Sequence, residues 1–152
     1  SRDGATGWSR PEFAEALPEP ICQASLLSYD DPAAPGKSLL LFSGPESLER
    51  ADGKAAPGVR RDRQTLAVKL SRDDGSSWVT TRTLEPGPSA YSDLAVLPDG
   101  TILCFYESGR PGATRPNSKR TDWPYARLTL ARFNLEWLTA DRDASTSAAS
   151  SR

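Results

Sequence analysis

The sequence has 152 residues with 19 basic and 20 acidic side chains, which is enough chain for one domain with a real core and gives a formal net charge of -1. This charge provides no overall attraction to nucleic acid or to an anionic membrane, and no apolar run approaches the roughly 18 residues of a membrane-spanning helix. Histidine is absent, so histidine-based catalysis and the commonest metal ligand are excluded, and neither a metal nor a cofactor is expected.

Short β-type runs follow one another along the chain and are separated by turn residues. These runs are Gln23–Tyr29, Ser38–Ser43, Gln64–Ser71, Trp78–Leu84, Tyr91–Leu97, Thr101–Glu107 and Tyr125–Phe133. No stretch combines sustained helical periodicity with caps, and Pro11–Leu17 is expected to form one short turn at most. The chain is therefore predicted to be all-β.

The remaining segments read as loops and as a tail. Residues 46–62 and 108–122 are polar and rich in Gly, Pro and Arg, as is typical of long surface loops. Residues 140–152 form a low-complexity tail that is predicted to be disordered, which leaves 1–139 as the folded part. Cys22 and Cys104 lie beside apolar runs and are predicted to be buried free thiols; their spacing does not suit a zinc site.

One turn motif occurs twice. Ser71–Trp78 fits the pattern S-x-D-x-G-x-x-W, and Ser1–Trp8 fits it except that Ala5 replaces the glycine. Ser71 and Asp73 are suited to accept hydrogen bonds from the turn, Gly75 permits a positive φ, and Trp78 is expected to be buried. These roles are structural, since a calcium loop would need more convergent carboxylates. Repetition of such a hairpin unit favours the four-stranded blades of a β-propeller.

This motif resembles the Asp box of sialidases, and other segments resemble the same family in order and spacing. Gly87–Leu94 is similar to the segment around the family's nucleophilic tyrosine, and Arg132–Leu138 is similar to its closing strand. Further similar segments are Pro20–Gln23, Leu41–Ser43, Leu97–Gly100 and Cys104–Glu107. The resemblance covers residues 1–139.

The resemblance implies a six-bladed propeller, of which this chain would hold about two blades and one loose outer strand. It implies a retaining exo-α-sialidase that removes terminal sialic acid from glycans. In this interpretation Tyr91 is the nucleophile, Arg63 is one of the arginines that clamp the sugar carboxylate, and Glu107 orients a clamp arginine from another part of the chain. The implied partners are a sialylated glycan and the remaining propeller blades upstream. This substrate class favours a secreted or cell-envelope location.

The chemistry of the substrate gives a reason for these residue types. Sialic acid carries a carboxylate on its anomeric carbon, so a carboxylate nucleophile would approach a like charge, whereas a neutral phenol avoids this repulsion. A guanidinium matches both oxygens of the sugar carboxylate. The other clamp arginines, the acid/base aspartate and the activating glutamate of the family have no counterpart in this sequence, so the chain is expected to be inactive alone.

Strand counting predicts where the three candidates lie. A turn through Pro98–Gly100 places Leu97 opposite Thr101 and hence Tyr91 opposite Glu107. Arg63 immediately precedes the run Gln64–Ser71, so all three are expected at one rim with the Asp box at the other. Weaker candidates for this rim are Gln23, Trp123 and Tyr125, for which plain packing is the alternative.

Two other functions remain open from the sequence. One is a sialidase-like propeller that binds glycans without hydrolysing them. The other is a structural Asp-box propeller unrelated to sugars, although such a protein would have no reason to retain Arg63, Tyr91 and Glu107 at one rim.

Overall fold

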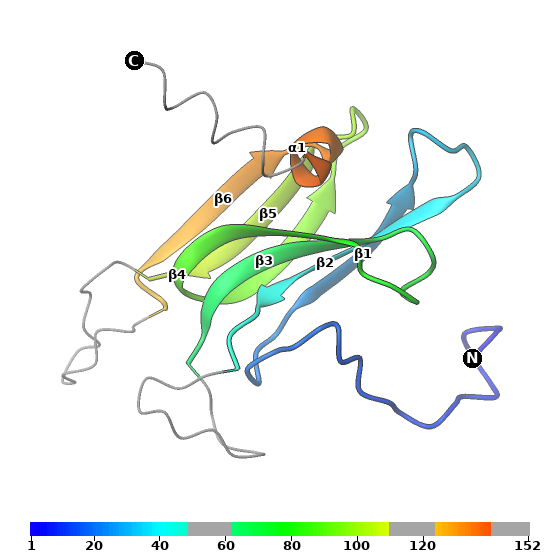
Figure 1. Cartoon of the computed structure of the whole chain (residues 1–152), viewed down its shortest axis with the longest axis horizontal. Coiled ribbons are helices and arrows are strands. Elements are labelled where there is room, and N and C mark those ends of the chain that lie inside the picture. Colours follow the sequence, from blue (N-terminus) through cyan, green and yellow to red (C-terminus); the bar gives the residue numbers. More distant parts are fainter. Residues whose placement is uncertain (49–61, 110–123, 141–152) are drawn as a thin grey trace.

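The computed structural model describes residues 1–48, 62–109 and 124–140. Within them the chain forms β1 (Ser25–Asp30), β2 (Ser38–Pro45), β3 (Gln64–Ser71), β4 (Thr80–Val96), β5 (Ile102–Ser108), β6 (Arg127–Phe133) and the short helix α1 (Leu135–Thr139). Neighbouring strands are antiparallel, and their order in the six-stranded sheet is their order in the chain (Figure 1). The all-β prediction is confirmed, while closure into a six-bladed propeller stays a prediction.

The long strand β4 joins the two halves of the sheet. Its first part pairs with β3 and its second part with β5, and it curves between them (Figure 1). Two strands, Trp78–Leu84 and Tyr91–Leu97, were predicted here, and the break between them over residues 85–90 is wrong. Pro88 lacks an N–H, but its carbonyl accepts from the Gly109 N–H, while the Ser89 N–H donates to the Arg63 carbonyl.

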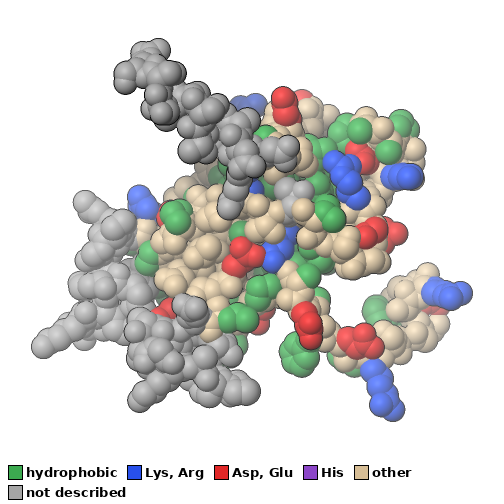
Figure 2. Space-filling model, in the orientation of Figure 1, with side chains coloured by type: hydrophobic (Ala, Val, Ile, Leu, Met, Phe, Trp, Pro, Cys, Tyr) green, Lys and Arg blue, Asp and Glu red, His purple; other side chains and the backbone are tan. Residues whose placement is uncertain are grey.

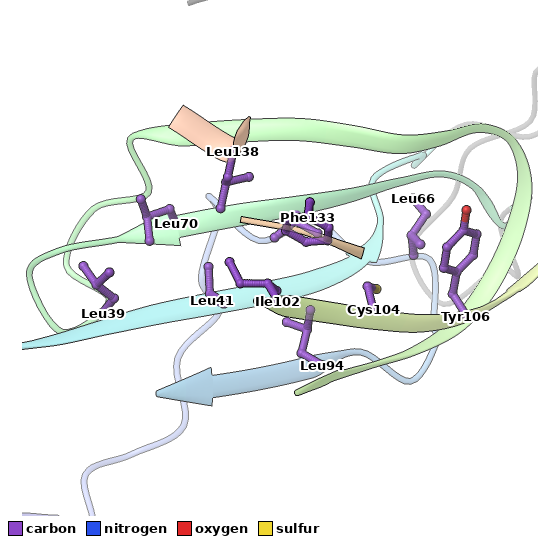
Figure 3. Close-up of a cluster of buried hydrophobic side chains, with 11 residues drawn as sticks. Leu39, Leu41, Leu66, Leu70, Leu94, Ile102, Cys104, Tyr106, Phe133 and Leu138 are labelled. Carbon is purple, nitrogen blue, oxygen red and sulfur yellow. The ribbon is translucent and has the colours of Figure 1, made fainter. Parts of the chain in front are cut away.

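The hydrophobic core fills the space between these two halves (Figure 3). Alternate residues of each strand point into it, as a sheet with one buried face requires. One half contributes Leu39, Leu41, Leu66, Val68 and Leu70, and the other contributes Leu94, Ile102, Cys104, Tyr106 and Phe133. Leu138 of α1 closes one end of the core. Cys104 is a buried free thiol as predicted, whereas Cys22 is only partly buried.

Helix α1 was not predicted, because Arg132–Leu138 was interpreted as a strand. The strand ends at Phe133, and the Asn134 side chain then accepts a hydrogen bond of 2.8 Å from the Trp137 N–H, which caps the helix. Arg82 covers one face of the Trp137 ring at 4.6 Å and donates to the Ala140 carbonyl. No helix in the described residues is long and apolar enough to cross a membrane.

The two copies of the turn motif differ in their surroundings. Asp73 accepts hydrogen bonds from the Ser71 hydroxyl and the Ser77 N–H, both at 2.8 Å, and Gly75 has the expected positive φ of 85°. Trp78 packs edge-on against Phe42 at 6.1 Å, but it is half-buried rather than buried as predicted.

The first copy makes similar local hydrogen bonds without the packing. Asp3 accepts from the Thr6 N–H at 2.8 Å, yet the Trp8 side chain is 70% exposed. The predicted outer strand is not formed, since residues 1–24 contain no strand. Within Pro11–Leu17 one turn forms, in which the Leu17 N–H donates to the Ala14 carbonyl. On the face shown in Figure 2, acidic and basic side chains are interspersed.

The remaining predicted segments lie largely beyond the described ranges. The predicted loops 46–62 and 108–122 are described only at their ends, and the predicted tail 140–152 is described only at residue 140.

Candidate active site

The candidate residues gather at one end of the strands. Arg63 lies immediately before β3, and the Asp-box turn follows the other end of that strand. Eight residues of β3 separate them, a span of roughly 25 Å at about 3.3 Å per residue. Tyr91 lies within β4 and Glu107 near the end of β5. The predicted separation of the site residues from the structural turn is thus confirmed.

The hairpin between β4 and β5 has the predicted register except at the last predicted pair, Tyr91 and Glu107. The Leu97 N–H donates to the Thr101 carbonyl at 2.9 Å, and regular pairing continues as far as Ser92 opposite Tyr106. The register then shifts, so Tyr91 and Glu107 are not a regular ladder pair. Instead the Tyr91 N–H donates to Glu107 Oε2 at 3.2 Å. The two residues are therefore neighbours through this hydrogen bond from backbone to side chain, which strand counting did not predict.

Arg63 and Tyr91 are also adjacent. The guanidinium carbon of Arg63 lies over the Tyr91 ring, 5.2 Å from its centroid, a distance at which a cation is attracted to the ring face. The Tyr91 side chain remains 46% exposed. The structure thus brings all three predicted site residues together and leaves the phenol accessible.

Two further residues hold the Arg63 guanidinium. Its Nη1 donates to the Tyr125 hydroxyl at 2.7 Å, and its Nη2 donates to the Ile21 carbonyl. Its Nε is buried and has no acceptor among the described residues. Tyr125 was only a weak candidate from the sequence and Ile21 was not a candidate, since nothing in the sequence places residues 21, 63 and 125 side by side.

The ionisation of this cluster is favourable for anion binding. Burial alone would lower the pKa of Arg63, but Cys22, Tyr91 and Tyr125 raise it overall, so the guanidinium stays charged. Burial raises the pKa of the Cys22 thiol to about 11, against an opposing effect of Arg63. At neutral pH Cys22 is therefore a neutral thiol, and the site carries a fixed positive charge on Arg63.

Two β-branched residues next to Arg63 have strained backbones. Ile21 has φ 57° and Thr65 has φ 61°, in the left-handed region that such residues rarely adopt. Thr65 coincides with register shifts between β3 and β4, and the Ile21 carbonyl is one of the Arg63 acceptors. Strain of this kind costs of order 1–3 kcal/mol per residue and clusters at functional sites.

A shallow pocket of about 200 Å³ opens beside this cluster. Its lining includes Gln23, Tyr91, Asp93, Phe105, Glu107 and Leu128. Gln23 thus lies at the predicted rim, although its side chain donates to the neighbouring Ala24 carbonyl. Trp123 lies outside the described residues.

A larger pocket near α1 is a poor candidate for the site. It has a volume of about 640 Å³ and contains none of the predicted site residues. The Trp137 ring in its lining is in contact with both Arg82 and Phe133. The described residues also contain no cluster of three or more His, Cys, Asp or Glu that could hold a metal ion.

Comparison with known proteins gives relatives of one kind. A sialidase of Micromonospora viridifaciens is 30% identical over 141 residues, which are 91% of this chain and 18% of the relative. A sialidase of Bacteroides fragilis (strain YCH46) is 31% identical over 113 residues, which are 71% of this chain and 19% of the relative.

A solved structure agrees with these sequence relatives. The structure named Hadza microbial sialidase Hz136 matches with a TM-score of 0.54 and 26% identity, covering 79% of this chain and 19% of that protein. No family model matches the chain. The chain therefore spans less than a fifth of the length of each of these relatives, 18% or 19%.

Proposed function

This chain is homologous to sialidases over most of its length, and on that premise we propose that it supplies part of the active site of a retaining exo-α-sialidase. The observation that carries the proposal is the contact between Arg63 and Tyr91, a fixed cation over an accessible phenol beside a pocket. The substrate would be a glycan with terminal sialic acid.

In the proposed reaction Tyr91 Oη attacks the anomeric carbon of sialic acid. The glycosidic bond breaks, the departing oxygen takes up a proton from a general acid elsewhere in the protein, and the phenol proton passes to a general base. Water then attacks the same carbon and gives up a proton to a base, while the bond to Tyr91 Oη breaks and the released phenolate takes up a proton. Two inversions at one carbon give net retention, and tyrosine is the known alternative to a carboxylate nucleophile in sialidases. The 46% exposure of Tyr91 supports this role, because the oxygen must reach a substrate.

Arg63 is proposed to bind the sugar carboxylate. Its Nη1 and Nη2 already have protein acceptors, while the buried Nε has none among the described residues. Each Nη nitrogen carries a second N–H beside the one that its protein acceptor takes, and the sugar carboxylate could accept from one of these. The same carboxylate could accept from a second N–H of the guanidinium, which is the two-point geometry that arginine favours with carboxylates.

Glu107 is proposed to orient a clamp arginine from another part of the protein. In this chain its carboxylate accepts the Tyr91 N–H, so it also fixes the backbone at the nucleophile. A carboxylate has acceptor capacity for several donors and can serve both partners.

The test is covalent trapping with a fluorinated sialosyl fluoride, which lets the first step proceed and slows the second. The full-length protein is quenched, digested and examined by mass spectrometry. The expected result is a sialosyl adduct on the peptide that contains Tyr91. An adduct on another residue would contradict the proposed nucleophile. Sialoside binding without any adduct or turnover would favour the glycan-binding alternative.

A further inference from the structure

We propose that Tyr125 is a positioning residue that fixes the orientation of the Arg63 guanidinium, a role that rests on the proposed function of Arg63. The Tyr125 hydroxyl accepts from Arg63 Nη1 at 2.7 Å, and the side chain itself is only partly exposed. Tyr125 does not touch the reacting atoms in this proposal. It acts through Arg63.

The two acceptors of Arg63 lie on different nitrogens of the same plane. Tyr125 holds Nη1, and the Ile21 carbonyl holds Nη2. Either bond alone would let the guanidinium swing about the bonded atom, whereas two anchor points define both the direction and the plane of the group. The remaining N–H groups of Nη1 and Nη2 are then left at defined places. A planar donor that is oriented before binding loses less side-chain freedom when a carboxylate arrives.

The fold holds both anchors in place. The Ala126 N–H donates to the Ser108 carbonyl at 3.1 Å, which ties the residue after Tyr125 to the end of β5, next to Glu107. The Ile21 carbonyl belongs to a residue with φ 57°, a backbone conformation that costs energy unless its surroundings impose it. Adjacent Pro20 is fully buried, which helps to fix that segment. Both anchors are therefore tied to neighbouring parts of the structure, Tyr125 through Ala126 to the end of β5 and Ile21 through the adjacent buried Pro20.

The first experiment follows the Arg63 side chain without any ligand. In the full-length protein, the guanidinium protons of Arg63 are observed by ¹⁵N-resolved NMR and assigned with Arg63→Lys. Resolved Nη signals are expected in the wild type, because the hydrogen bonds restrict rotation. Tyr125→Phe should collapse them to an averaged signal. The matched control is Tyr29→Phe, because the buried Tyr29 hydroxyl has no hydrogen-bond partner among the described residues and its removal should leave the Arg63 signals unchanged.

The second experiment compares two ligands, a sialoside and its analogue with the carboxylate reduced to an alcohol. Tyr125→Phe should weaken binding of the sialoside about five- to tenfold, the worth of roughly one hydrogen bond, and leave binding of the reduced analogue unchanged. Equal losses for both ligands would mean that Tyr125 supports the fold generally and would overturn the inference.

The outcomes separate the two proposals. If the wild type binds the sialoside and Tyr125→Phe matches it in both experiments, the positioning role is wrong and the proposed function stands. If the NMR signals change as expected but the wild type does not bind the sialoside, then Tyr125 does hold Arg63 but the proposed function is wrong. The contact between Tyr125 and Arg63 then has no role in catalysis.

Discussion

The two ends of β3 are built in different ways. At the Asp73 end, the hydrogen bonds of the Asp73 carboxylate and of the Ser71 hydroxyl all join residues within four positions, while Arg72 pairs with the more distant Asp31. At the Arg63 end, the acceptors lie 42 and 62 residues away, in Ile21 and Tyr125. The contacts at the first end are therefore mainly local, whereas those at the second join distant segments and, among the described residues, leave the Arg63 Nε without an acceptor. A structural turn can be held together by its own residues. A binding site instead combines residues from distant parts of the chain and needs hydrogen-bonding groups that are left over for a ligand.

The largest contrast is expected from Tyr91→Phe at the Arg63 end. The substitution keeps the ring that Arg63 covers and removes only the oxygen, so the thermal unfolding midpoint of the full-length protein should barely change. Sialidase activity should fall by about three orders of magnitude or more, because the covalent route is closed. The measurement is kcat with a fluorogenic sialoside beside a thermal melt. A fully active, well-folded variant would show that the nucleophile is another residue.

A smaller loss is expected from Arg63→Lys, which keeps the charge but not the planar donor set. Sialoside binding should weaken about 10- to 100-fold, because the ammonium replaces a two-point contact and loses both anchors. The carboxylate-reduced analogue should be little affected, and calorimetric titration of both ligands gives the comparison. Arg72→Lys at the opposite end of β3 is the matched control, and it should change neither affinity.

At the Asp73 end, the effect should be on stability alone. Trp78 is half-buried against Phe42, so Trp78→Ala should lower the free energy of unfolding by about 1–3 kcal/mol, less than the 3–5 kcal/mol of a fully buried ring. Trp8 is its counterpart in the first copy of the motif and is 70% exposed, so Trp8→Ala should change stability by less than about 0.5 kcal/mol. Chemical denaturation of both variants tests this, and equal effects would remove the distinction between the copies.

The smallest expected effect is a change in the stability of the fold with pH. Hydrogen bonds from Ser77 and Ser71 lower the pKa of Asp73. A lowered folded pKa means that this carboxylate stabilises the fold above its unfolded pKa of about 4 and loses that contribution as the pH falls through the folded value. Asp73→Ala should therefore be less stable than the wild type at pH 7, and the difference should shrink below about pH 4. Denaturation curves at several pH values measure it, and a constant difference would contradict the assignment.

Most of the sheet could be predicted because the strands are short β-type runs separated by turn residues. The continuity of β4 could not, since Pro86 and Pro88 are usual strand breakers. They are tolerated where β4 leaves one partner for the next, a position at which carbonyls are needed more than N–H groups. Helix α1 was missed because five residues are too few for a periodic signal; Asn134 as a cap was the available clue.

The candidate site, like the sheet, could be predicted only in part. Tyr91 and Glu107 could be brought to one rim by counting from the Pro98–Gly100 turn, because antiparallel pairing fixes register over short distances. Arg63 could be brought there by its position immediately before the run Gln64–Ser71. The Tyr125 and Ile21 contacts could not be counted in this way, since they join segments that no ladder connects. A positive φ at a β-branched residue such as Ile21 also leaves no trace in the sequence, because local preference argues against it.

The strands lie in the sheet in the same order as in the chain, and this order has a consequence for how the protein folds. Each strand pairs with the one synthesised just before it, so a growing chain, emerging at roughly 5–20 residues per second, never has to wait for a distant partner. Once the first part of β4 has docked on β3, its second part presents an open edge on which β5 and then β6 can add in turn. The sheet can thus grow from one end by successive addition, with little of the delay that long-range pairing imposes on other all-β proteins.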